Sequence, residues 1–142
     1  MGLFGSLDIS ASALSAERLR MDVTAENLAN AQTTRTAAGG AYHRKVVQLE
    51  EAPASGGFGA ALSSALSRGV QVAGITEDAT PLKQVYDPGH PDADARGYVQ
   101  MPNVEPVEEM VDLITASRSY EANVTAIQTA KSMFSKTLEL LR

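Results

Sequence analysis

The sequence contains neither cysteine nor tryptophan, and aromatic residues make up only 5% of its 142 residues. Without cysteine the chain can form no disulfide framework, no thiol nucleophile and no thiolate metal site. Basic residues are also few, because 12 Lys and Arg stand against 17 Asp and Glu and leave a formal net charge of −5. Nucleic-acid binding needs clustered positive charge against the phosphates. The composition therefore argues against a nucleic-acid partner.

Long apolar runs are missing as well. No stretch approaches the roughly 20 apolar residues of a membrane-spanning helix, so no membrane span is expected. The first eight residues, MGLFGSLD, lack the basic start and apolar centre of a cleaved secretion signal, and none is expected there. The hydrophobic residues present, 44% of the chain, are mostly Ala, Leu, Val, Ile and Met. This mixture favours packed helices over a large β-core.

A first amphipathic helix is predicted from about Gly5 to Gln32. Two rows of apolar residues recur at helical spacing, one through Leu7, Leu14, Met21 and Leu28 and the other through Ile9, Ala16, Leu19 and Val23. Together they make a face wide enough for more than one neighbour. Asn27 and Asn30, near its end, are expected to cap carbonyl groups or to fix the exit turn.

The middle of the chain, residues 35–104, is interrupted by Gly or Pro every few residues. This pattern predicts short strands joined by long loops, with the strands at 42–49, 70–76, 82–86 and 97–101. The segment 52–67 is rich in Ala, Gly and Ser, and is expected to be a mobile excursion or a short, weak helix.

A second long helix is predicted from Pro106, a favoured first helical residue, to the end of the chain. Alternating steps of three and four define its seam, which runs through Met110, Leu113, Ser117, Tyr120, Val124, Ile127, Lys131, Phe134, Leu138 and Leu141. This is a heptad pattern. The predicted fold is mainly α with a small β-element: a helix in residues 1–34, strands and loops in 35–104, and a helix in 105–142, with the helices packed as a coiled coil.

The length of the second helix indicates an assembly. About 36 residues at 1.5 Å each make roughly 54 Å, whereas a compact domain of this size is roughly 40 Å across. The first helix covers about 40 Å of one side and has a wide apolar face of its own. Other chains must cover the remainder. A monomeric or dimeric helical hairpin capped by the β-element is the alternative.

One segment, DPGHPDAD at residues 87–94, looks as if it could carry chemistry. One His and three Asp could bind a divalent cation, and a small metal-dependent hydrolase using Asp87, His90 and Asp92 is one hypothesis. The prolines and the glycine favour consecutive turns instead, with Asp accepting backbone hydrogen bonds. No catalytic residue, metal or cofactor is therefore expected. The basic run at 43–45, HRK, is interpreted as solvated or interface charge.

Polar residues interrupt the second seam at Arg118, Tyr120 and Glu121. One interpretation is that these are polar residues between heptads that simply face solvent. The sharper hypothesis is a polar layer that specifies how helices align, at some cost in stability.

Several segments give the chain a family resemblance. AENLANAQTT at 25–34 resembles the N-terminal signature of flagellar rod and hook proteins, and EEMVD at 108–112 with SRSYEAN at 117–123 is similar to their C-terminal signature. TTRT at 33–36 departs from the more usual Thr-Gly-Tyr. The stretches 39–45, 86–93 and 97–104 resemble proximal rod members of the family, so the resemblance covers nearly the whole chain apart from 52–67.

The resemblance implies a structural subunit of the proximal rod, the helical tube that transmits torque from the flagellar motor to the hook. It implies terminal helices packed in an inner layer against copies of the chain and related rod proteins. It also implies a periplasm-spanning location reached through the flagellar type III export apparatus without a cleaved signal. The alternative is a coiled-coil subunit of another secretion-type tubular assembly. The expected interface residues are Leu7, Leu14, Met21, Asn27, Leu28, Asn30, Met110, Leu113, Arg118, Tyr120, Glu121, Val124, Ile127, Phe134, Leu138 and Leu141.

Overall fold

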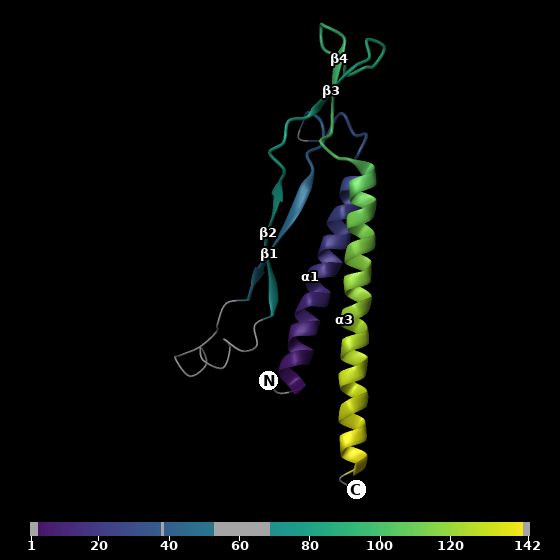
Figure 1. The fold of residues 1–142 in the computed structure, drawn as a ribbon. Coiled ribbons are helices and arrows are strands. Elements are labelled where there is room, and N and C mark those ends of the chain that lie inside the picture. Colours follow the sequence, from purple (N-terminus) through teal and green to yellow (C-terminus); the bar gives the residue numbers. More distant parts are fainter. Residues whose placement is uncertain (1–2, 38, 53–68, 141–142) are drawn as a thin grey trace, which may run out of the picture.

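A computed structural model shows two long antiparallel helices joined by two short β-hairpins (Figure 1). It describes residues 3–37, 39–52 and 69–140. The elements there are α1 (Leu3–Ala29), β1 (Lys45–Glu51), β2 (Val70–Glu77), β3 (Lys83–Tyr86), β4 (Tyr98–Met101) and α3 (Pro106–Leu140). The prediction of a mainly α chain with a small β-element is confirmed. Leu141 and nearly all of the predicted excursion at 52–67 lie outside the described residues.

Each hairpin is a two-stranded antiparallel sheet. In the first, Lys45 of β1 pairs with Glu77 of β2, and the register shifts between Gln48 and Leu49. In the second, β3 pairs with β4 from Lys83↔Met101 to Tyr86↔Tyr98. Figure 1 shows α1 between the β1–β2 hairpin and α3, while the β3–β4 hairpin projects beyond the end of the helix pair where α3 begins.

The most buried positions of the two helices carry small or polar side chains. Buried residues recur seven apart, at Ala16 and Val23 on α1 and at Glu109 and Ala116 on α3. On α1 the most buried row is therefore the second predicted row, and the row through Leu14 is half-buried beside it.

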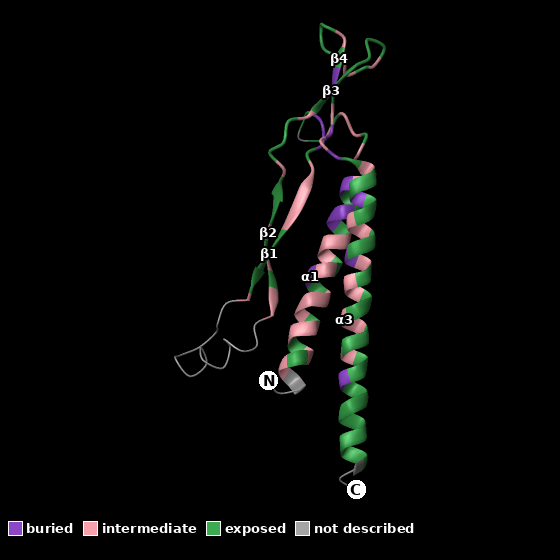
Figure 2. Ribbon diagram, in the orientation of Figure 1, coloured by how far each residue is buried: buried purple, intermediate pink, exposed green. Residues whose placement is uncertain are grey.

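One end of α3 extends past α1. The 35 residues of α3 span about 52 Å and the 27 residues of α1 about 40 Å. Ala130 is the last buried residue of α3 in the described structure, and residues 131–139 are all exposed (Figure 2). We call residues 131–139 the α3 tail. Neither of these described helices is long and apolar enough to cross a membrane.

The β1–β2 hairpin depends on a close approach to α1 at Gly69. A Cβ there would lie 2.5 Å from Ser12 Oγ, which accepts a hydrogen bond from Val70 N at 3.1 Å. Gly69→Ala is therefore expected to lower the free energy of unfolding by about 1–3 kcal/mol in urea titrations, because either the strand moves away or the Ser12 hydroxyl gives up its hydrogen bonds with Val70 and Ile9. Gly74→Ala is the matched control, since nothing lies within 4 Å of a Cβ at that position. Equal losses in both variants would contradict the role of this approach.

Candidate functional site

Two of the largest fully buried side chains in the described structure are polar. Asn27 exposes 2% of its surface and Glu109 exposes 1%. Asn27 lies near the end of α1, Glu109 lies in the first turn of α3, and the buried Tyr42 precedes β1. We call the cluster of Asn27, Tyr42, Arg44, Glu109 and Asp112 the polar junction. It lies where the chain leaves α1 and where it enters α3.

Asn27 uses the whole hydrogen-bonding capacity of its amide. Nδ2 donates to the carbonyl oxygen of Lys45 at 2.8 Å and to Glu109 Oε2 at 3.0 Å. Oδ1 accepts from the backbone N–H of Lys45 and from the hydroxyl of Tyr42, both at 2.9 Å. Two donors and two lone pairs are all that this side chain has. Asn27 therefore fixes both the path of the chain into β1 and the position of α3.

Arg44 supplies the positive charge of the junction. Its Nε donates to Glu109 Oε1 at 2.5 Å, and Nη2 lies 3.3 Å from Asp112 Oδ2. The hydrogen bond to Glu109 raises the pKa of Arg44, and burial opposes it by a smaller amount. The interpretation of this run as solvated or interface charge is therefore wrong for Arg44, whose guanidinium neutralises a fully buried carboxylate. His43 is exposed, and Lys45 pairs with Glu26 at the surface.

Asn103 connects the junction to the second hairpin. Its Oδ1 accepts from the backbone N–H of Arg44 at 2.8 Å, and its Nδ2 donates to the carbonyl oxygens of Asp78 and Thr80. Hydrogen bonds from Thr80 are the main cause of the lowered pKa of Asp78, which also lies 3.8 Å from Arg44 Nη1. Both helices and the loops flanking β3 and β4 are thus tied to one group of side chains.

Tyr42 gives the junction a pH-dependent stability. Burial, with smaller contributions from Glu26 and Glu109, raises the pKa of Tyr42 to about 12. An unfolded tyrosine has a pKa of about 10, so between pH 10 and 12 the folded chain holds the proton that the unfolded chain has lost. Stability contributed by the neutral tyrosine is complete below pH 10 and is lost as the pH rises to 12, by about 1.4 kcal/mol per pH unit at most.

We expect denaturant titrations at pH 9–12 to show this alkaline loss in the unmodified chain and a shallower loss in Tyr42→Phe. Tyr86→Phe is the matched control, because it removes the hydroxyl of an exposed tyrosine outside the polar junction. The same slope in the Tyr42→Phe variant would show that other groups cause the alkaline loss.

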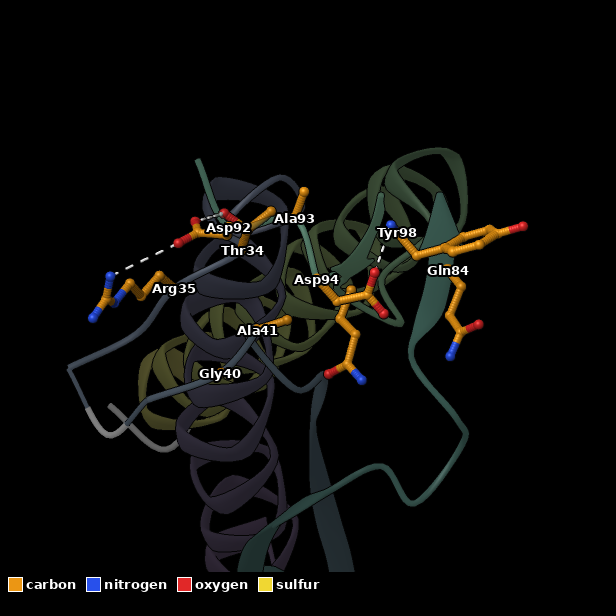
Figure 3. A pocket seen from close by; sticks show the side chains of 10 residues that line it. Thr34, Arg35, Gly40, Ala41, Gln84, Asp92, Ala93, Asp94 and Tyr98 are labelled. Carbon is orange, nitrogen blue, oxygen red and sulfur yellow. Dashed lines mark hydrogen bonds and ion pairs between the residues drawn. The ribbon is translucent and has the colours of Figure 1, made fainter. Parts of the chain in front are cut away.

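The segment at 87–94 forms the expected turns. Asp87 Oδ1 accepts from the backbone N–H of Gly89, and the Nδ1 of His90 accepts from the backbone N–H of Asp92 at 3.1 Å. Asp92 is also bound by Thr34 Oγ1 at 2.9 Å and lies 3.8 Å from Arg35, as Figure 3 shows. In the part of the chain that the structure describes, no three His, Asp or Glu side chains gather as a metal site would require.

The expected interface residues lie in several different environments. Asn27 is the one buried residue among those described, and Asn30 caps α1 by donating to the carbonyl oxygen of Glu26 at 2.9 Å. The half-buried group is Leu7, Leu14, Met21, Leu28, Asn30, Leu113, Tyr120, Val124 and Ile127. The exposed group is Met110, Arg118, Glu121, Phe134 and Leu138. The polar layer at 118–121 thus lies mostly outside the contact between α1 and α3, and its role between chains stays a prediction.

Sequence reasoning did not identify Arg44 and Glu109 as buried partners. The helix dipole is a sufficient local explanation for Glu109, because it favours acidic side chains in a first turn. The signal that could have found it is its spacing, seven residues before the buried Ala116. Asn27 likewise follows Val23 by four residues, on the same side of α1. Polar residues inside two such rows indicate a buried polar contact between the helices.

Comparison with known proteins finds flagellar basal body rod families at both ends of the chain. Residues 7–35 match the family described as "Flagella basal body rod protein", and residues 95–140 match "Flagellar basal body rod FlgEFG protein C-terminal". These two ranges contain Asn27 and Glu109.

Individual relatives agree. The chain is 49% identical to "Flagellar basal-body rod protein FlgC" of Bacillus subtilis, over 99% of both chains. It is 46% identical to the protein of that name from Borreliella burgdorferi, over 100% of this chain and 99% of the relative. The Salmonella typhimurium protein of the same name is 45% identical, over 99% and 98% of the two chains.

Proposed function

The chain belongs to the flagellar basal body rod protein family and is a structural subunit of the basal-body rod, and from this premise we propose that it is a subunit of the proximal rod held there by its two terminal helices. The family is a structural one. We propose that the chain has no catalytic activity and acts by transmitting torque. The observation that carries this proposal is the exposure of large apolar side chains near the end of α3, where Leu138 exposes 53% of its surface.

Packing of the helices along the rod would give the shaft its stiffness. The seven-residue spacing of the buried positions on α1 and α3 supports coiled-coil packing of residues 1–34 and 105–142 as an inner layer. Each Å² of apolar surface that neighbours cover stabilises the contact by about 25 cal/mol. In this proposal residues 35–104 lie farther out and contact neighbouring subunits.

Two polar sites would set the alignment of the helices. The polar junction fixes α1 against α3 within one subunit, because its hydrogen bonds have partners in only one register. Arg118, Tyr120 and Glu121 would then set the axial register between subunits, since Arg118 and Glu121 are exposed and can meet another chain.

The partners in this proposal are other copies of the chain and related rod proteins in the basal body, within the periplasm. We further propose that the subunit arrives through the flagellar type III export apparatus. Before assembly, apolar side chains near the end of α3, such as Leu138, face solvent, so we expect the ends of the chain to be loosely ordered in the free subunit.

Isolated basal bodies provide the test. A tagged copy of the chain, expressed in place of the native one, should co-fractionate with basal bodies, and electron microscopy should place it in the rod next to the motor. Absence of the tagged chain from the rod, or its co-fractionation with a different export machine, would overturn the proposal. Circular dichroism of dilute protein gives a second check, because a fully cooperative helix signal in the monomer would contradict loosely ordered ends.

A further inference from the structure

The two hairpins have strand edges, and the chain itself closes some of them. On β1, the backbone N–H and C=O groups of Lys45 point away from β2, and Asn27 bonds both. On β4, the N–H of Tyr98 donates to Asp94 Oδ1 and its C=O accepts from the N–H of Asp94, both at 2.9 Å (Figure 3). A strand of another chain cannot add where these edge groups are already bonded.

The edge of β2 is open near its end. Residues that lie opposite each other in an antiparallel pair turn their backbone groups either both toward the partner strand or both outward. Lys45 turns outward and lies opposite Glu77, so Glu77 also turns outward, as does Ile75 two residues before it. At the other end of β2 the N–H of Val70 donates to Ser12 Oγ, which closes the edge there. The open part of this edge is therefore its last few residues.

The edge of β3 is open as well. Tyr98 turns outward and lies opposite Tyr86, so Tyr86 and Gln84 turn outward on β3. In residues 3–37, 39–52 and 69–140 no group of the chain bonds the outward backbone groups of these two residues, or those of Ile75 and Glu77. Large apolar side chains lie along both open edges, where Ile75 exposes 48% and Tyr86 65% of its surface. Unpaired backbone groups beside exposed apolar side chains favour addition of another strand.

Resting on the proposed function, we propose that β3 of one copy adds to the open edge of β2 of a second copy as a parallel strand. Figure 1 shows β2 and β3 running toward the same end of the molecule, so copies that point the same way along a rod present these strands in parallel. One contact of this kind gives both open edges a partner. Because the two edges differ, the contact repeats from copy to copy instead of closing a symmetric dimer.

The positions of the acidic side chains select one register for this pair. With Glu77 opposite Val85, the N–H of Glu77 meets the C=O of Gln84, and the C=O of Glu77 meets the N–H of Tyr86. A shift of two residues would place Glu77 opposite Asp87, and like charges in opposite positions destabilise a pair of strands. The first register is therefore the one that we propose.

Other charged side chains beside the contact already have partners in their own copy. Asp78 lies 3.8 Å from Arg44, and Lys83 lies 2.6 Å from Glu105. The contact therefore depends on backbone hydrogen bonds and apolar side chains. A pairing of only a few residues is weak by itself, so it forms where helix packing already holds the copies together.

Disulfide trapping tests the contact without background, because the chain contains no cysteine. In the proposed register Thr76 lies opposite Gln84, and both side chains are exposed. Adjacent strands lie about 4.8 Å apart, a separation that a disulfide spans. Cells that express Thr76→Cys and Gln84→Cys on differently tagged copies should yield a 76–84 product in oxidised basal bodies. Gln100→Cys is the matched control, since Gln100 is exposed opposite Gln84 on β4, and it should be trapped several-fold less.

Proline variants at the same two positions test the backbone groups. Gln84→Pro removes an outward N–H that the hairpin does not use, and Gln100→Pro removes the corresponding N–H on β4. The two isolated variants should therefore have similar urea midpoints. The amount of chain in basal bodies should fall several-fold with Gln84→Pro and much less with Gln100→Pro.

The outcomes separate this contact from the rod assignment. Equal trapping of Gln84→Cys and Gln100→Cys, or an 84–84 product in place of the 76–84 product, overturns the inference. Absence of the 76–84 product from copies that enter basal bodies overturns the strand contact and leaves the rod assignment intact. Absence of the unmodified tagged chain from basal bodies overturns both.

Discussion

Arg44→Met is expected to lower the free energy of unfolding by about 3–5 kcal/mol, the cost of a buried charge that has lost its partner. Glu109 exposes 1% of its surface, and Arg44 is the cation that lies against it at 2.5 Å. The hydrogen bond from Asn27 remains in the variant but brings no positive charge to the carboxylate. Urea titration at neutral pH measures the change.

Two further variants show whether the effect comes from the buried carboxylate. Lys45→Met removes a cation of similar length from a partly exposed pair with Glu26, for which a loss of about 0–1 kcal/mol is expected. The double variant Arg44→Met/Glu109→Leu should recover most of the stability, because the fully buried carboxylate is removed together with its cation and the carboxylates that remain, Asp78 and Asp112, are more exposed. Equal losses for Arg44→Met and Lys45→Met, or no recovery in the double variant, would contradict the role given to the junction.

Ile127→Asp and Leu138→Asp are expected to separate folding from assembly. Ile127 is half-buried in the region where α3 packs on α1, so a carboxylate there should cost about 3 kcal/mol in the isolated chain. Leu138 is exposed on the tail, and its substitution should leave the urea midpoint nearly unchanged. Both variants should fail to enter the rod, because Ile127→Asp weakens the packing of the subunit itself and Leu138→Asp would bury a charge when the tail assembles.

Swimming in soft agar and the protein content of isolated basal bodies provide the readouts for these two variants. Thr129→Asp is the matched control, since Thr129 is an exposed α3 residue between the two positions. It should enter the rod and support swimming. Normal motility with Leu138→Asp would exclude the tail from assembly.

The positions of the helices and strands could be predicted because their signals are local. Pro106 begins α3 as predicted, and each of the four strands begins and ends within three residues of its prediction. Gly and Pro interrupt the middle region wherever a strand cannot continue, and heptad spacing identifies a helix without knowledge of its partner.

The polar junction could not be predicted in the same way, because its partners are distant in the sequence. Asn27 and Glu109 are 82 residues apart, and each has a sufficient local explanation, as a cap or as a complement to the helix dipole. The sequence also does not show which of the two apolar rows of α1 is the more deeply buried. Ala16 and Val23 have smaller side chains than Leu14 and Met21, yet they are the more deeply buried residues.

The position of the polar junction makes the folding of this subunit directional. Its hydrogen bonds and ion pairs fasten the two helices where α1 ends and α3 begins, and the opposite end holds no comparable set among the described residues. In the assembly that we propose, the free molecule is held together at this end, and the entropy loss of ordering the opposite end is postponed until neighbouring subunits are present. The last step of folding would then accompany polymerisation and would link growth of the shaft to the presence of subunits that are already assembled.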